Sequence, residues 1–96
     1  MDWYLIRLTP PRPTFADDST EAEAAIIGAH FAYLKGLEAA GRLKLAGRTA
    51  GAEVGIALIL AESLEDAQAM LADDPAIRAG VFTGVVHRFF PAIGSI

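Results

Sequence analysis

The stretch VGIALILA, residues 54–61, decides the fold class of this chain. Bulky and small apolar residues alternate along it with a period of two, which is typical of a β-strand. Because neither set of side chains is polar, the sequence predicts a strand that is covered on both of its faces. Both faces of this strand therefore need an apolar cover.

Three further strands are predicted around it. Residues 3–9, WYLIRLT, carry apolar side chains on both faces, and residues 83–90, TGVVHRFF, end before a proline. A shorter strand is predicted at residues 42–48, RLKLAGR, with Leu43 and Leu45 on one face. A turn, TAGAE, follows it.

Two helices are predicted between these strands. The first begins with a capping box, in which Thr20 is the N-cap and Glu23 follows three residues later, and it ends before Gly41. The second begins after Ser63 in the motif SLED and continues to the motif DDP. The proline-rich segment PPRPTFADDS, which precedes the first helix, is predicted to be a loop.

The element order β-α-β-β-α-β predicts a single α+β domain over residues 1–96 with a ferredoxin-like fold. In this fold two helices cover one face of the sheet. Three of the strands are apolar on both faces, so the second face would be left bare, and an apolar patch of that size is rare on a monomer. We therefore expect a homodimer that packs the two open sheet faces together.

Composition argues against several classes of protein. Hydrophobic residues make up 53% of the chain, but the longest apolar run, VGIALILA, is far shorter than the roughly 18 residues that span a membrane. A net charge of −4 with scattered Lys and Arg argues against nucleic acid, which requires a basic patch. The chain has no Cys, and its first residues lack the features of a signal peptide. We expect a cytoplasmic protein with neither a nucleic-acid nor a membrane partner.

His30 is a polar ring within an apolar helical stripe. Its helical neighbours on the same side are apolar or aromatic, namely Ile26, Ile27, Tyr33, Leu34 and Leu37. A buried imidazole needs a hydrogen-bond partner, because an unpaired polar group costs about 1–3 kcal/mol. Two interpretations remain open. His30 is either a core residue bonded to a backbone carbonyl or to Tyr33, or a general acid–base residue that lines a pocket.

Asp74 is the second candidate for the site. In the motif DDP it is a predicted N-cap, with Pro75 at the first position of a short helical turn that ends near Gly80. A carboxylate that accepts a hydrogen bond from an imidazole also fixes the tautomer of the ring. Asp74 would therefore suit a catalytic pair with His30, although sequence spacing does not show that the two residues meet.

Three further residues are candidates for ligand binding: Arg12, Arg48 and His87. The arginines would suit an anionic ligand, but each is also consistent with a solvated surface charge. His87, on the last predicted strand, would line a cavity between subunits or belong to the sheet. Two histidines without metal-ligand spacing make no metal site, and no phosphate-binding loop or dinucleotide motif occurs. We expect neither a metal nor an organic cofactor.

Three segments carry a resemblance to a known family: HFAYLKGLEAAGRLKLAG (30–47), AESLEDA (61–67) and DPAIRAG (74–80). In order and spacing the chain resembles the YCII-related (YciI-like) family over nearly its whole length. The resemblance implies a dimeric α+β barrel of ferredoxin-like subunits. It also implies a cleft in which His30 pairs with Asp74.

Two positions depart from the family pattern. Ala76 stands where an aromatic residue often follows the DP pair, and Arg48 stands where a proline often follows the second strand's AG. A smaller wall and an added cation are the expected consequences for the pocket. The departures weaken the transfer of any particular substrate from the family.

The resemblance further implies a small-molecule enzyme, since some relatives act on small aromatic or lactone-like compounds by elimination or isomerisation. We expect His30, oriented by Asp74, to perform acid–base chemistry of an elimination, isomerisation or hydrolysis type on a small cyclic or aromatic metabolite. Two alternatives remain open. The chain would be a non-catalytic metabolite-binding module, or an accessory dimerisation module whose barrel is filled by Trp3, Phe82 and Phe89.

Overall fold

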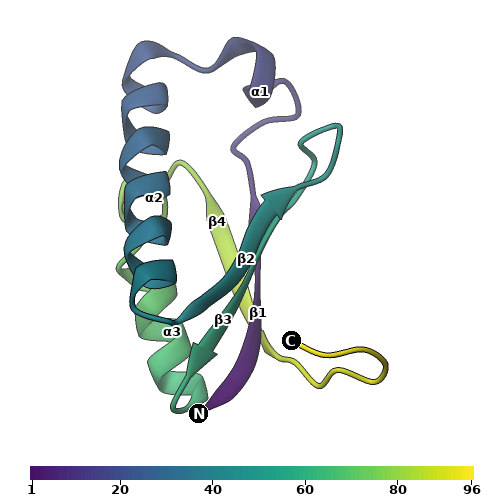
Figure 1. Cartoon of the computed structure of the whole chain (residues 1–96). Coiled ribbons are helices and arrows are strands. Elements are labelled where there is room, and N and C mark those ends of the chain that lie inside the picture. Colours follow the sequence, from purple (N-terminus) through teal and green to yellow (C-terminus); the bar gives the residue numbers. More distant parts are fainter.

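An antiparallel four-stranded sheet and the helices that cover one of its faces form two layers (Figure 1). The computed structural model describes residues 1–96. The strands are β1 (Asp2–Thr9), β2 (Leu43–Arg48), β3 (Gly55–Ala61) and β4 (Thr83–Arg88). The helices are α1 (Phe15–Asp18), α2 (Glu21–Ala39), α3 (Leu64–Ala72) and α4 (Pro75–Arg78).

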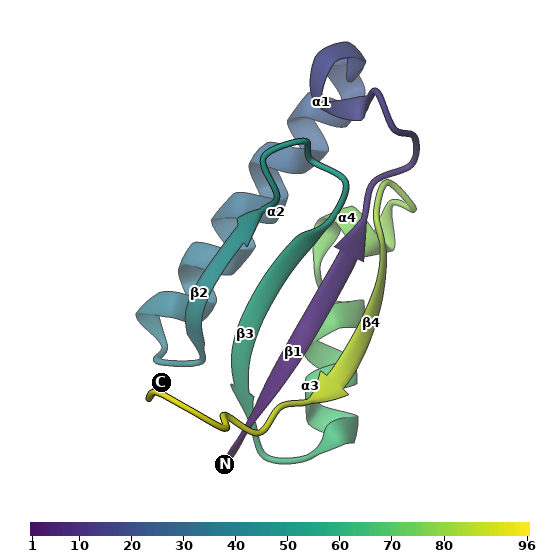
Figure 2. The same cartoon turned by 90° about the vertical axis from the view of Figure 1, so that its right-hand side faces the viewer.

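The strands lie in the order β2-β3-β1-β4, and each neighbouring pair is antiparallel (Figure 2). In the middle of the sheet Leu5 lies between Leu58 of β3 and His87 of β4. The long helices α2 and α3 connect β1 to β2 and β3 to β4, and both lie behind the sheet in Figure 2. This topology confirms the predicted ferredoxin-like α+β fold.

The core lies between the sheet and the helices. Alternation along β1 places Tyr4, Ile6 and Leu8 on the helix side, where each is almost completely buried. The facing residues of β3 and α3 complete the cluster: Ala57, Ile59, Ala61, Ala67 and Met70. Small residues at three of these positions let α3 approach the sheet closely.

The opposite face of the sheet also carries apolar side chains, as the sequence predicts. Leu45, Ile56 and Val85, which lie on three different strands, are exposed by 50%, 39% and 44%. The C-terminal residues 91–96 leave β4 and run out on this same side of the sheet (Figure 1). No helix has the length and the apolar character that crossing a membrane would require.

A bulge in β2 corrects one prediction. Leu43 pairs with Ile59 and Leu45 pairs with Leu58, and the register shifts between the two pairs. Because Leu58 and Ile59 are consecutive in a strand, their side chains point to opposite faces. Leu43 therefore joins the core while Leu45 lies on the open face, and the prediction that they share a face is wrong.

The predicted helix starts are confirmed. Thr20 Oγ1 accepts a hydrogen bond from the backbone N–H of Glu23 at 3.1 Å, and the Glu23 carboxylate accepts one from the Thr20 N–H at 2.8 Å. Ser63 caps α3 in the same way, through a 3.0 Å bond from the N–H of Asp66. Gly41 follows α2 with φ of 74°, a left-handed conformation that glycine adopts without strain.

Two segments differ from the predictions by more than a single residue at one end. The segment predicted to be a loop contains α1, a single turn of helix that polar contacts of Arg12 and Thr14 with Asp18 hold in place. The last strand ends at Arg88 and not at residue 90. The ladder closes there because the N–H of Phe89 bonds the carbonyl of Trp3, near the start of β1, which leaves the following residues without a partner strand.

Candidate active site

His30 and Asp74 are in direct contact. Nδ1 of His30 lies 2.8 Å from Oδ1 and 2.7 Å from Oδ2 of Asp74. His30 projects from the middle of α2, and Asp74 is the residue that precedes α4. The two residues are only 4% and 3% exposed, so water does not compete for the contact. The contact that the resemblance implied is thus present, 44 residues apart in the chain.

The start of α4 fixes the Asp74 carboxylate. Oδ1 accepts a hydrogen bond from the backbone N–H of Ala76 at 2.9 Å, and Pro75 occupies the first helical position, where no N–H is needed. Ala76 is itself fully buried, so its backbone has little freedom to move. The N-cap prediction for Asp74 is confirmed, and the same oxygen serves both the cap and the histidine.

The carboxylate decides which nitrogen of His30 carries a proton. An ionised carboxylate only accepts hydrogen bonds, so the facing Nδ1 must donate, and the neutral ring then has its lone pair on Nε2. Every buried side-chain nitrogen or oxygen in the structure has a hydrogen-bond partner. Nε2 of His30 has none within the chain, so this atom is not completely enclosed by protein, and His30 is one of the residues that line a cavity. A basic nitrogen with a fixed tautomer therefore borders open space.

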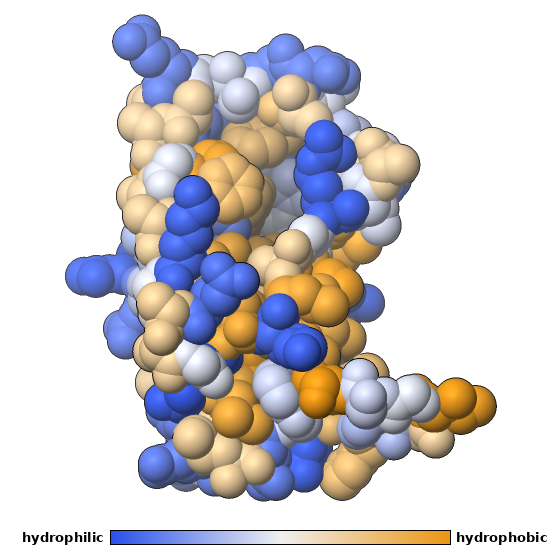
Figure 3. All heavy atoms as spheres, viewed as in Figure 1, coloured by the Kyte–Doolittle hydropathy of each residue, from blue (hydrophilic) through white to orange (hydrophobic).

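That space is a cavity of about 490 Å³ between α2 and the β2–β3 hairpin, with α1 at one end (Figure 3). His30 lines it, and most other lining residues are apolar. Three aromatic rings contribute to its wall. Phe82 stands edge-on to the His30 ring at 5.4 Å between centroids, Phe31 lies 5.5 Å from that ring, and Phe15 packs against Phe82 at 5.8 Å.

Three charged side chains lie at the rim of the cavity: Lys35 and Glu38 from α2, and Arg48 from the end of β2. All three are exposed. Arg48 donates two hydrogen bonds of 3.1 Å through Nη1, to the carbonyls of Thr49 and Ala50. Of the residues predicted to bind ligand, Arg48 is the one that shares the cavity with His30.

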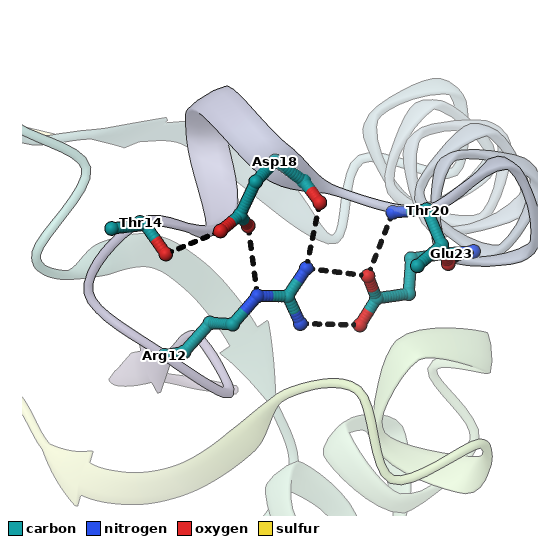
Figure 4. Close-up of polar contacts among 5 residues, drawn as sticks. All are labelled: Arg12, Thr14, Asp18, Thr20 and Glu23. Carbon is teal, nitrogen blue, oxygen red and sulfur yellow. Dashed lines mark hydrogen bonds and ion pairs between the residues drawn. The ribbon is translucent and has the colours of Figure 1, made fainter.

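Arg12 has a different environment, shown in Figure 4. It binds both carboxylate oxygens of Glu23 at 2.9 and 2.8 Å, and both the carboxylate and the backbone carbonyl of Asp18. These hydrogen bonds raise the pKa of the guanidinium and, with the Thr20 N–H, lower the pKa of Glu23 to about 2. We call this set, with Thr14, the Arg12 clasp. The Arg12 clasp does not line the cavity. It connects α1, which lines the cavity, to the start of α2.

His87 also lies away from the candidate site. It projects from β4 on the open face of the sheet, paired with Leu5, and it does not line the cavity. Tyr33, which the sequence left open as a partner of His30, donates its hydroxyl to the carbonyl of Met70 at 2.6 Å. Burial, and after it the nearby charges of Asp73 and Asp74, raise the pKa of Tyr33.

The aromatic wall and Lys35 were not predicted as site residues. A signal for part of this set exists in the sequence, because Phe31, Lys35 and Glu38 follow one another at helical spacing beside the stripe of His30 and Leu34. Phe31 is 56% exposed and lines the cavity. No three His, Cys, Asp or Glu side chains are grouped as ligands for a metal ion.

Comparison with known proteins identifies the family. The model of the YCII-related domain matches residues 4–89. The chain belongs to the YCII-related family. The match includes His30 and Asp74 and confirms the resemblance on which their pairing was predicted. No curated protein matches the sequence.

Solved structures support the same fold. One is 5-chloro-2-hydroxyhydroquinone dehydrochlorinase from Burkholderia phenoliruptrix AC1100 in complex with 2,5-dihydroxybenzoquinone, with a TM-score of 0.72 and 22% identity over 92% of this chain and 93% of that one. Another is muconolactone isomerase, with a TM-score of 0.73 and 18% identity over 98% of this chain and 94% of that one. At such identities the similarity establishes the α+β barrel subunit fold of the YCII-related chain.

Proposed function

We propose that this YCII-related protein is a small-molecule enzyme in which His30, oriented by Asp74, moves a proton on a small cyclic or aromatic metabolite. The observation that carries the proposal is the 2.7 Å contact of Nδ1 with a buried carboxylate, which leaves Nε2 at an apolar cavity. A cavity of about 490 Å³ is within the usual range for small ligands, which is roughly 300–1,000 Å³.

The proposed step begins when Nε2 of His30 accepts a proton from a saturated carbon of the bound ring or from a ring hydroxyl group. The electron pair of the broken C–H or O–H bond moves into the conjugated system of the substrate. In an isomerisation the imidazolium returns the proton to another carbon, whereas in an elimination the pair forms a double bond and the leaving group departs with its own electrons. Asp74 stabilises the imidazolium in both cases, because its carboxylate faces Nδ1.

The wall of the cavity favours this chemistry. Apolar and aromatic side chains exclude water around Nε2, so the interaction between the imidazolium and Asp74 is stronger than it would be in solvent. Phe31 and Phe82 flank the His30 ring and limit the directions from which a substrate approaches it. The steps use only side chains of the protein itself.

The names of two similar structures agree with these reaction types. A dehydrochlorinase carries out an elimination and an isomerase a rearrangement, and both proteins share the fold of this chain. Their substrates are therefore sensible first probes. The first probe is 5-chloro-2-hydroxyhydroquinone, assayed by chloride release. The second is muconolactone, assayed by isomerisation, and solvent deuterium incorporation is a second readout for each.

The decisive experiment compares His30→Gln with His87→Gln on these probes. Loss of the Nε2 base should lower the rate by about 10²–10⁴-fold, the usual contribution of a general acid–base residue. His87→Gln is the control for loss of an imidazole outside the cavity, and because His87 lies on the open face of the sheet, the variant must also sediment as the wild type does. Equal rates for wild type and His30→Gln would eliminate the acid–base role.

The cavity is also compatible with a metabolite-binding module that performs no chemistry. The same variant separates the two functions. His30→Gln should leave ligand affinity within a few-fold of the wild type in both cases, so only turnover differs between them. Turnover that disappears while affinity persists supports the enzyme. Binding without turnover or deuterium incorporation in the wild type supports the module.

We also propose that two copies of the chain pack their open sheet faces together as a homodimer. Leu45, Ile56 and Val85 form an exposed apolar surface across this face, and a second copy offers the same surface in return. Such a dimer would form the α+β barrel that the family resemblance implies.

A further inference from the structure

The rim of the His30 cavity carries more positive than negative charge. Lys35 and Glu38 lie on α2 and Arg48 lies at the end of β2, and neither cation takes part in any ion pair of the structure. The remaining wall is apolar apart from the His30 ring and backbone. A neutral apolar ligand would use the wall but would leave both cations without partners.

The hairpin loop after β2 holds Arg48 in a defined orientation. Its Nη1 donates to the carbonyls of Thr49 and Ala50, so that nitrogen is fully used. Nε and Nη2 make no hydrogen bond within the chain and remain free. These two nitrogens form one edge of the guanidinium, the edge that suits two parallel hydrogen bonds to an anion.

The loop itself is tied together around Thr49. The Thr49 hydroxyl bonds the Glu53 carboxylate at 2.6 Å and accepts from the N–H groups of Glu53 and Val54 at 3.1 and 3.3 Å. The pKa of the Glu53 carboxyl is lowered, chiefly by its hydrogen bond with Thr49 and to a smaller extent by the nearby charge of Arg48. The two side chains nevertheless form no ion pair, so Arg48 is available to a ligand.

The opposite wall favours a flat ligand. Phe31 and Phe82 flank the His30 ring, and Phe31 is exposed by 56% toward open space, while aromatic faces stack best on planar rings. Lys35 follows Phe31 by one helical turn on α2, so a cation stands beside this aromatic surface. A planar ring with an ionised substituent would satisfy both features.

The geometry points to Arg48, assisted by Lys35, as the anion-binding subsite of the His30 cavity, which selects planar cyclic substrates that carry a carboxylate or an ionised hydroxyl group. This inference rests on the proposed function, since it names the substrate class of the same site. Arg48 is a specificity-determining residue here. It acts on the ionised substituent, while His30 acts on the reacting carbon.

Binding measurements test the subsite without any turnover. Isothermal titration compares 2,5-dihydroxybenzoquinone, whose acidic hydroxyl groups are ionised at neutral pH, with the neutral 2,5-dimethoxybenzoquinone of the same ring. The wild type should bind the anionic quinone more tightly, and added salt should reduce that preference. Arg48→Met should lower the affinity for the anionic quinone by about tenfold and leave the affinity for the neutral quinone within about twofold of the wild type.

Matched variants exclude trivial causes. Lys35→Met should lower the affinity for the anionic quinone by less than Arg48→Met does, and Arg48→Lys should recover part of that affinity. Lys44→Met removes an exposed cation of β2 outside the cavity, so it should leave the affinity for both quinones unchanged. Because Lys35 forms no hydrogen bond or ion pair with the hairpin loop, its effect also separates charge from any loosening of the loop by Arg48→Met.

The inference is overturned if the wild type shows no preference for the anionic quinone, or if Arg48→Met weakens both quinones equally. Either result leaves the acid–base role of His30 standing, because that role is measured by deuterium incorporation and chloride release. The converse outcome is also possible to recognise. If anion selectivity depends on Arg48 but the His30→Gln variant is fully active, the acid–base role of His30 is rejected and the anion-binding subsite is supported.

Discussion

Oδ1 of Asp74 accepts hydrogen bonds from two donors at once, Nδ1 of His30 at 2.8 Å and the backbone N–H of Ala76 at 2.9 Å. One carboxylate therefore starts α4 and orients the histidine. Because the helix cap holds the carboxylate in place, the imidazole is fixed by the fold and not by the ligand. Changes at Asp74 should accordingly separate into effects on folding and effects on the histidine.

Asp74→Asn keeps a side chain that caps helices well but removes the negative charge beside His30. We expect stability close to that of the wild type, a mixture of His30 tautomers in ¹⁵N NMR spectra, and a rate on any substrate lower by about 10²–10⁴-fold. Asp74→Ala should show the same loss and also unfold more easily by about 1 kcal/mol or more, because the cap is gone. An unchanged tautomer in Asp74→Asn would contradict the orienting role.

The sequence predicted the sheet because the alternating pattern is strong where both faces of a strand are apolar, as in β3. The capping motifs at Thr20 and Ser63 located the helix starts, since those motifs depend on residues only three positions apart. The bulge in β2 was not predictable in this way. Whether Leu45 faces the core depends on how β2 pairs with β3, which is a long-range property.

The site was predictable to a similar degree. His30 was identifiable because a polar ring in an apolar stripe needs a partner, and family resemblance supplied Asp74. Position in the chain could not show that Arg12 would be engaged by Glu23, or that Arg48 would reach the cavity. Both outcomes depend on loops whose course is set by side-chain hydrogen bonds, and such contacts leave no periodic pattern.

The Arg12 clasp predicts a pH-dependent contribution to stability. Glu23 has its pKa lowered from 4.5 to about 2, chiefly by the hydrogen bonds from Arg12 and then by the Thr20 N–H. A lowered pKa means that the contribution is complete above pH 4.5 and is lost as the pH falls toward 2. Thermal unfolding should therefore show that Glu23→Gln is less stable than the wild type at pH 6 and equally stable near pH 2.

Glu21→Gln is the control for this comparison. Glu21 lies in the same first turn of α2 but makes no contact with Arg12, so its variant should follow the wild type at every pH. A Glu23→Gln deficit that persists unchanged at pH 2 would contradict the role of the ionised clasp.

At Gly84, α3 packs closely on β4. A Cβ added there would lie 2.8 Å from Cδ1 of Leu71 and 3.1 Å from Cδ2 of Leu8, closer than atoms in packed proteins normally approach. Gly84→Ala should destabilise the protein by about 1–3 kcal/mol through overpacking, measured by urea unfolding. Gly28→Ala, on α2 with no atom within 4 Å of the added carbon, should instead stabilise it by about 0.5–1 kcal/mol.

The open face of the sheet predicts how the dimer will respond to charge. Val85 is 44% exposed on β4, opposite Arg7 of β1, and in the proposed dimer it would be buried against the second copy. Val85→Glu places a carboxylate in that apolar interface, where it would be desolvated, so sedimentation should show monomers at concentrations at which the wild type is dimeric. Leu64→Glu is the matched control, because Leu64 is similarly exposed, by 46%, but starts α3 in the other layer. Dissociation by Leu64→Glu with no effect of Val85→Glu would place the interface on the helices.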